Sequence, residues 1–126
     1  MSEITEDGYQ SLREFAFSAH TVPNQWDYIA IYDSSKNEVI RVSITGDSRF
    51  NWTDLDGDYV GIVSGEIQGS DTDIPTDGTT IEYVALHDSA TGGRQITQLE
   101  QVSPLTITGG GDAMNISHSI EIPKIL

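Results

Sequence analysis

Apolar residues in this chain follow a helical spacing only near the N-terminus and a strand-like spacing in every later segment. Five residues recur at intervals of three and four, which places them on one helix face: Tyr9, Leu12, Phe15, Ala16 and Ala19. Acidic residues precede them, where negative charge suits the helix dipole, and Pro23 follows. The spacing predicts a helix over about residues 3–19.

Seven later segments have the patterns of strands. The clearest is 113–122, where apolar residues and His118 alternate with polar residues, as in a strand with one face on a core and one in water. The others are 27–33, 38–45, 59–67, 79–87, 96–102 and 104–108. Clusters of glycine with aspartate or asparagine separate many of them and favour turns.

One helix followed by strands and turns predicts a mainly β protein: an antiparallel β-sandwich, jelly-roll-like, with one N-terminal α-helix. At 126 residues the chain is long enough for one sizeable core. No linker composition interrupts it. We therefore expect residues 1–126 to form a single domain, with the sandwich over about residues 26–123.

One stretch of the sequence occurs in two similar copies. Residues 28–35 (YIAIYDSS) resemble residues 83–90 (YVALHDSA), which begin 55 positions later. Two interpretations are open: a coincidence between two buried strands that each end in an Asp-Ser turn, or two equivalent central strands of one sandwich.

The charge balance excludes several classes of partner. Six basic residues stand against twenty acidic ones, for a net charge of −14 and a pI near 4.1. Nothing in such a chain could replace the counterions of a nucleic acid, so we expect no nucleic-acid partner. Scattered acids with few lysines favour a folded surface adapted to high salt, where screening weakens the self-repulsion.

Several sequence features that are absent narrow the possible classes of protein further. The chain has no cysteine, which excludes disulfides, thiol catalysis and cysteine-based metal sites. No apolar stretch approaches the roughly 20 residues of a membrane-spanning helix, so membrane insertion is not expected. The N-terminus reads Met1-Ser2-Glu3, with acid where a secretory signal carries base, so no such signal is predicted.

A calcium loop is the only metal site that the spacing suggests. Asp54, Asp56 and Asp58 match the first half of an EF-hand loop. The sixth position would be Tyr59, where the sharp turn needs glycine, and the twelfth would be Gly65, where a bidentate glutamate belongs. An acidic surface turn is the favoured interpretation, and we expect no cofactor.

No catalytic set stands out. The three histidines, His20, His87 and His118, lack the spacing of a ligand pair, and no serine lies in a Gly-x-Ser-x-Gly elbow. We therefore do not expect an enzyme. Asn51 and Asn115 begin glycosylation sequons, the second inside a strand. Aromatic residues gather between Phe15 and Tyr59, which fits either a core cluster or a carbohydrate platform.

The order of several motifs resembles a known family. These are the Tyr28-Ile29-Ala30-Ile31-Tyr32 strand, Glu38 and Arg41 with two residues between them, the segment 80–93 that ends in Gly92-Gly93, Leu105-Thr106-Ile107-Thr108, and Gly111-Asp112 before the last strand. Together they resemble the small tail-fibre or baseplate-type β-sandwich proteins of tailed viruses. The acidity suggests a virus of a halophilic archaeon. The likeness covers most of the chain but not residues 47–77, and Ala85-Leu86-His87 departs from the family's Gly-Leu-Phe type.

The resemblance implies a virion structural protein, tail-fibre or baseplate-associated, that forms a symmetric homo-oligomer with other virion proteins as partners. It implies no catalytic residue. One alternative is a capsid decoration or turret protein on the head surface. The other is a carbohydrate-binding module, with a host surface glycan as its ligand. Sheet edges, the helix and the apolar C-terminal tip, Ile125-Leu126, are the expected docking elements.

Overall fold

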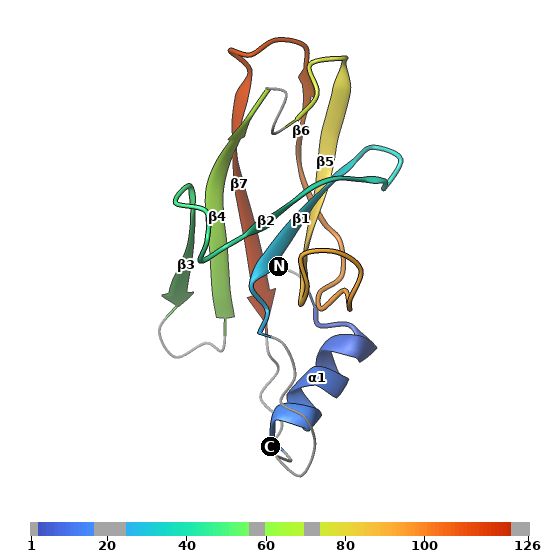
Figure 1. Cartoon of the computed structure of the whole chain (residues 1–126), viewed down its shortest axis with the longest axis vertical. Coiled ribbons are helices and arrows are strands. Elements are labelled where there is room, and N and C mark those ends of the chain that lie inside the picture. The colour runs from blue at the N-terminus through green and yellow to red at the C-terminus, as the bar shows by residue number, and fades with distance from the viewer. Residues whose placement is uncertain (1–2, 17–24, 56–59, 70–73, 122–126) are drawn as a thin grey trace.

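The described part of the chain forms two antiparallel sheets and one short helix (Figure 1). This computed structural model describes residues 3–16, 25–55, 60–69 and 74–121. The elements are α1 (Glu6–Ala16), β1 (Tyr28–Asp33), β2 (Glu38–Ser43), β3 (Phe50–Leu55), β4 (Val60–Gln68), β5 (Thr79–His87), β6 (Glu100–Ile107) and β7 (Ala113–Glu121).

The two sheets confirm the predicted antiparallel β-sandwich. One sheet has the strand order β2-β1-β5-β6 and the other has the order β3-β4-β7. Every pairing between neighbouring strands is antiparallel. The described residues thus make four strands and three, against the eight strands of a complete jelly roll.

Isoleucine dominates the core between the sheets. Each central strand alternates, so that every second side chain faces inward. The inward residues of β1, β4 and β7 are all almost completely buried: Ile29, Ile31, Val63, Ile67, Ile116 and Ile120. His118 lies in phase with the β7 residues and is buried among them, as the alternation predicts. β-branched side chains lose little rotamer freedom in strands, which suits this dense interior.

The two similar copies in the sequence are the two central strands of the larger sheet. β1 pairs with β5 so that Ala30 lies opposite Ala85, while Tyr28 faces His87 and Tyr32 faces Tyr83. A local two-fold axis therefore passes between the two alanines. It relates the hairpin β1-β2 to the hairpin β5-β6. The interpretation as two equivalent central strands is confirmed.

The helix begins later than the sequence predicts, at Glu6 rather than residue 3. Residues before it bond to the segment ahead of β6: the amide of Gln98 donates to the carbonyl of Glu3 at 2.9 Å. Thr5 then caps the helix, because its Oγ1 accepts the Gly8 amide at 3.1 Å. Leu12 packs against the core, so the helix uses apolar surface on its own chain. Residues 17–19 of the prediction lie outside the described residues.

Two strand predictions are wrong for identifiable reasons. β3 is missing from the predicted strands, because asparagine and aspartate interrupt its alternation of Phe50 and Trp52. The two predicted strands at 96–102 and 104–108 are instead one strand, β6, which begins at Glu100. Pro104 lies at the register shift between β5 and β6, where the ladder needs no proline N–H.

Gly8 sets how closely α1 approaches the sheet. A Cβ at this position would lie 2.5 Å from the carbonyl oxygen of Ile96 and would also clash with Ile4. We expect Gly8→Ala to lower the free energy of unfolding by about 1–3 kcal/mol, as overpacking does, despite alanine's higher helix propensity. Chemical denaturation measures this. Gly111→Ala is the control, because open space surrounds Gly111, and an unchanged Gly8→Ala protein would contradict the packing.

Candidate functional site

The outer face of the larger sheet carries a buried polar pair. Ala30 and Ala85 at the local two-fold axis are 0% exposed. Tyr32 and His87 occupy equivalent positions in the two copies, lean over these alanines from opposite ends and meet. The Tyr32 hydroxyl and His87 Nε2 are 2.5 Å apart. Larger residues than alanine would keep the two rings apart.

Burial controls the ionisation of this pair. Burial and the neighbouring Glu38 raise the pKa of Tyr32 to about 12, against the opposing charge of Arg41. Burial, followed by the positive charge of Arg41, lowers the pKa of His87 below its ordinary value, although Glu38 and Asp88 act in the other direction. Within the described residues, His87 Nδ1 is buried with no hydrogen-bond partner. The pair is thus a neutral tyrosine beside a histidine that resists protonation.

Arg41 of β2 fastens the loop after β5 onto this face. Its guanidinium donates to the carbonyl oxygens of Ser89 at 2.9 Å and Gly92 at 2.8 Å. The same group binds both carboxylate oxygens of Glu38, at 2.9 and 2.6 Å. Such a two-pronged contact is the strong form of an arginine ion pair. The loop is therefore held over the sheet by one side chain.

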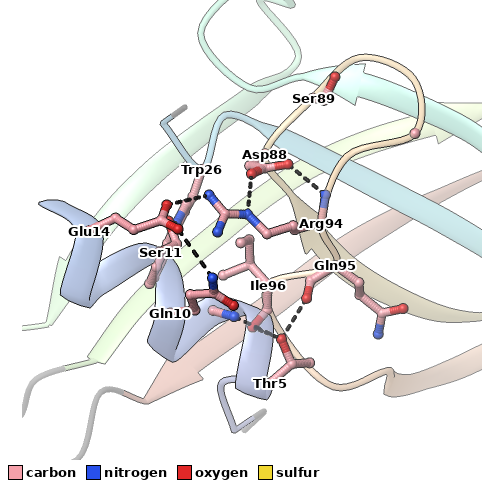
Figure 2. A network of polar contacts seen from close by, with 12 residues as sticks. Thr5, Gln10, Ser11, Glu14, Trp26, Asp88, Ser89, Arg94, Gln95 and Ile96 are labelled. Atoms are coloured by element: carbon pink, nitrogen blue, oxygen red, sulfur yellow. Dashed lines mark hydrogen bonds and ion pairs between the residues drawn. The ribbon is translucent and has the colours of Figure 1, made fainter. Parts of the chain in front are cut away.

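A second arginine ties the loop to the helix (Figure 2). Arg94 lies between Asp88 of the loop and Glu14 of α1, with nitrogen–oxygen distances of 3.1 Å to each. The backbone amide of Arg94 also donates to Asp88, at 2.7 Å. Nearby, the indole of Trp26 donates to Ser11 of α1 at 3.0 Å. Helix, loop and the start of β1 therefore form one connected unit.

A hollow of about 400 Å³ opens beside this unit. Its walls come from the segment that begins β1 and from the loop after β5. They consist of Gln25, Asp27, Tyr28, Asp88, Ser89 and Ala90. The hollow combines one aromatic ring, two carboxylates and an amide, which makes it a candidate binding site for a polar ligand.

The smaller sheet carries a second, polar depression of about 400 Å³ on its outer face. It includes both sequon asparagines, Asn51 of β3 and Asn115 of β7, and both are exposed. Ser64 of β4 lies between Asn51 and Ser117 in the register. The two sequons, far apart in the sequence, thus lie on one face.

A buried hydroxyl–imidazole–carboxylate chain lies at the side where β6 meets β7. Thr97 Oγ1 is 2.8 Å from His118 Nε2, and His118 Nδ1 is 2.8 Å from Glu100 Oε1. The order resembles a nucleophile, base and acid. However, Thr97 and His118 are both 0% exposed, and Thr97 Oγ1 already accepts the Leu86 amide at 2.9 Å. No substrate could reach this set, so its role here is structural.

Glu100 is the third member of this hydrogen-bonded series, and its carboxylate also binds the edge of β7 at Ser119. Burial opposes the charge of its carboxylate, but hydrogen bonds from His118 and the Ser119 amide outweigh that effect, and the pKa of Glu100 is lowered. Sequence reasoning missed this set. The in-phase histidine on β7 was its one visible signal, because its two partners come from the irregular segment before β6 and from the first residue of that strand.

The structure leaves the predicted calcium loop untested. Asp56 and Asp58 lie outside the described residues, and so does the side chain of Asp54, whose backbone belongs to β3. Elsewhere in the described part, no three or more potential ligands from histidine, aspartate or glutamate gather as a metal site would require. His20 also lies outside the described ranges.

The aromatic residues that were expected to cluster lie in different parts of the structure. Phe50 is 2% exposed in the core, whereas Trp52, two residues later, is 39% exposed and is the exposed large hydrophobic residue of the described chain. Trp26 contacts the helix, and Tyr28 lines the hollow. Neither a single core cluster nor a single platform describes them.

Comparison with known proteins adds no family to these observations: no family model, curated protein or solved structure matches the chain. Within the described ranges, no helix has the length and hydrophobicity needed to cross a membrane.

Removing the Thr97 hydroxyl should destabilise the fold. Thr97→Val leaves the Leu86 amide and His118 Nε2 without a buried partner, which should lower the free energy of unfolding by about 1–3 kcal/mol. Thr106→Val is the control, since the Thr106 hydroxyl bonds Thr80 on the exposed surface. Denaturation of both variants in urea measures the difference. Equal stabilities would contradict a structural role for Thr97.

His87 should make stability depend on pH. Because its pKa is lowered in the folded state, the unfolded chain binds its proton more tightly. Stability is complete above about pH 6.5, the ordinary histidine value, and falls as the pH drops below it. We expect wild-type protein to lose more unfolding free energy between pH 7 and pH 5.5 than His87→Gln, which retains a side chain able to bond Tyr32. Identical pH profiles would argue against this.

Proposed function

We propose that this chain is a non-catalytic structural subunit of a tailed virus particle, tail-fibre or baseplate-associated, which assembles into a symmetric oligomer through its sheet edges. The viral assignment rests on the resemblance of the sequence motifs. The observation that supports assembly is the exposure of Trp52 on the edge strand β3.

Three of the four edge strands carry features that discourage pairing with another chain. β6 contains Pro104 at a register shift. On β7, the Ser119 amide is taken by Glu100 at 3.0 Å. β2 carries the charged residues Glu38 and Arg41. Prolines, irregularities and charges are the usual means by which edges are protected.

β3 lacks most of these features. It pairs with β4 in continuous register over six residues, without a shift, and none of the described strands pairs with its other edge. Its one charged residue is Asp54, near its end. Phe50 is buried and Trp52 is partly exposed beside this free edge. Pairing of β3 with β3 of a second copy would extend the sheet and cover Trp52 by a two-fold contact.

The buried polar groups support a structural role more than a catalytic one. Thr97 and His118 are closed off from solvent, and the His87 ring is 6% exposed. A general base must reach the proton it removes. Instead, the His118 imidazole connects the smaller sheet to Glu100 of the larger sheet, and the His87 imidazole connects β5 to Tyr32 of β1.

Replacing Trp52 should weaken assembly. We expect Trp52→Ser to raise the concentration at which oligomers form by at least about tenfold, since a buried aromatic anchor contributes more than 1.4 kcal/mol. Sedimentation velocity in molar KCl, which screens the net charge, measures the assembly. Gln101→Ala, exposed on β6 at an edge of the other sheet, is the control. A wild-type protein that stays monomeric would refute edge pairing.

The particle itself tests the viral assignment. Antibody raised against the purified chain should label intact virus particles at the tail. Labelling of the head would favour the decoration alternative. Recovery of the protein only from soluble cell extract, with none in purified particles, would reject the virion role.

A further inference from the structure

The two-fold relation within the larger sheet places two tyrosines in equivalent positions with different surroundings. Tyr83 begins the second copy as Tyr28 begins the first. The ring of Tyr83 is covered by the chain's own cation, because the ammonium of Lys36 lies 5.5 Å from its centroid. This is a cation–π contact between the turn after β1 and a residue of β5.

The second copy lacks that cation. The position equivalent to Lys36, in the loop after β5, is Thr91. Where the first copy supplies an ammonium group to Tyr83, the second therefore supplies none to Tyr28. Tyr28 instead lines the hollow beside the loop (its Ser89 is labelled in Figure 2).

The acidic residues in the wall of this hollow are fixed in place. Asp27 accepts hydrogen bonds from the Ser43 hydroxyl at 2.8 Å, the Thr45 amide at 3.0 Å and the Thr45 hydroxyl at 2.9 Å. Asp88 is held by the amide and the guanidinium of Arg94. The two oxygens of Asp27 can accept four hydrogen bonds and accept three here, so Oδ1 keeps one acceptor site while the position of the side chain is set. Pre-organised acceptors reduce the entropy cost of binding.

The local charge favours a cation. Within the described residues, Asp27 has hydrogen-bond donors but no cationic partner. The neighbouring guanidiniums are already neutralised: Arg41 binds Glu38, and Arg94 is shared by Asp88 and Glu14. Of the two carboxylates that line the hollow, only Asp88 is therefore paired with a guanidinium in the described part, on a chain whose net charge is −14. Acidic walls of this kind concentrate cations.

We propose that the hollow formed by Gln25, Asp27, Tyr28, Asp88, Ser89 and Ala90 binds a primary alkylammonium group, supplied by a lysine side chain of a partner polypeptide. The ammonium would lie against Tyr28, as Lys36 lies against Tyr83. A primary ammonium fits better than a quaternary one, because it has N–H donors and one of them can use the spare acceptor of Asp27 Oδ1.

The probe that tests this is Nα-acetyl-lysine methylamide, titrated into the full chain at constant KCl concentration. We expect saturable changes in the backbone amide NMR signals of Gln25, Tyr28 and Ser89, with half-saturation in the millimolar range. The Nε-acetylated form of the same compound is the matched neutral ligand. It should produce no saturable change at those amides.

The tyrosine pair provides the matched variants. Tyr28→Ala should weaken binding of the probe by about tenfold, because the ammonium group loses its cation–π contact with the Tyr28 ring. Tyr83→Ala should leave binding within about twofold, since Tyr83 faces the chain's own lysine. The amide spectra of both variants report whether the sheet remains folded.

Four outcomes would overturn the proposal. These are equal binding of the charged and neutral probes, undiminished binding by folded Tyr28→Ala, a response to tetramethylammonium but not to the lysine probe, and a response only to methyl glycosides. The last two would assign the hollow to a quaternary ligand or to a glycan. Oligomerisation is not involved in this assay, so its result is independent of the edge-pairing proposal.

Discussion

The contact of Ala30 with Ala85 at the centre of the larger sheet determines much of what surrounds it. Two side chains of minimal size meet where β1 and β5 cross the local two-fold axis. Because they are small, Tyr32 and His87 can lie across them and join on the outer face. Ala30, Ala85 and Tyr32 thus form a small second core on the outer face of the sheet. The loop held by Arg41 lies beside this core.

Arginines of this acidic chain form ion pairs with several of its carboxylates. In the described part, Arg41, Arg49 and Arg94 each bind at least one carboxylate. Two of these arginines fasten the loop after β5, one to the sheet and one to the helix. Exposed ion pairs contribute little stability by themselves, so their effect is to select one loop position. The remaining acids repel one another, which is the physical reason to expect stabilisation by salt.

The sequence predicts those parts of this structure that depend on local periodicity. The alternation in residues 113–122 identifies β7 and its buried face, and the two similar copies offer central positions for β1 and β5 as one of two open interpretations. β3 and the course of β6 through Pro104 were missed, since polar residues interrupt the alternation in β3 and a register shift interrupts the pairing of β6 with β5. The hollow and the partners of His118 could not be predicted, because Thr97, Glu100 and the residues of the hollow come from segments whose spacing does not indicate that they meet.

The two copies differ where the sheet does not need them to agree. The tyrosine–apolar–alanine–apolar pattern that builds the pairing is the same in both, and so is the Asp-Ser pair that starts each turn. The differences are Tyr32 against His87 and Lys36 against Thr91. The first makes a hydrogen-bonded pair from what would otherwise be two tyrosine hydroxyls. The second leaves one tyrosine beside a hollow with acidic walls. The backbones of the two copies are thus related by symmetry, but these side chains are not. Tyr83 is covered by Lys36, whereas Tyr28 lines the hollow that we propose binds a lysine ammonium group.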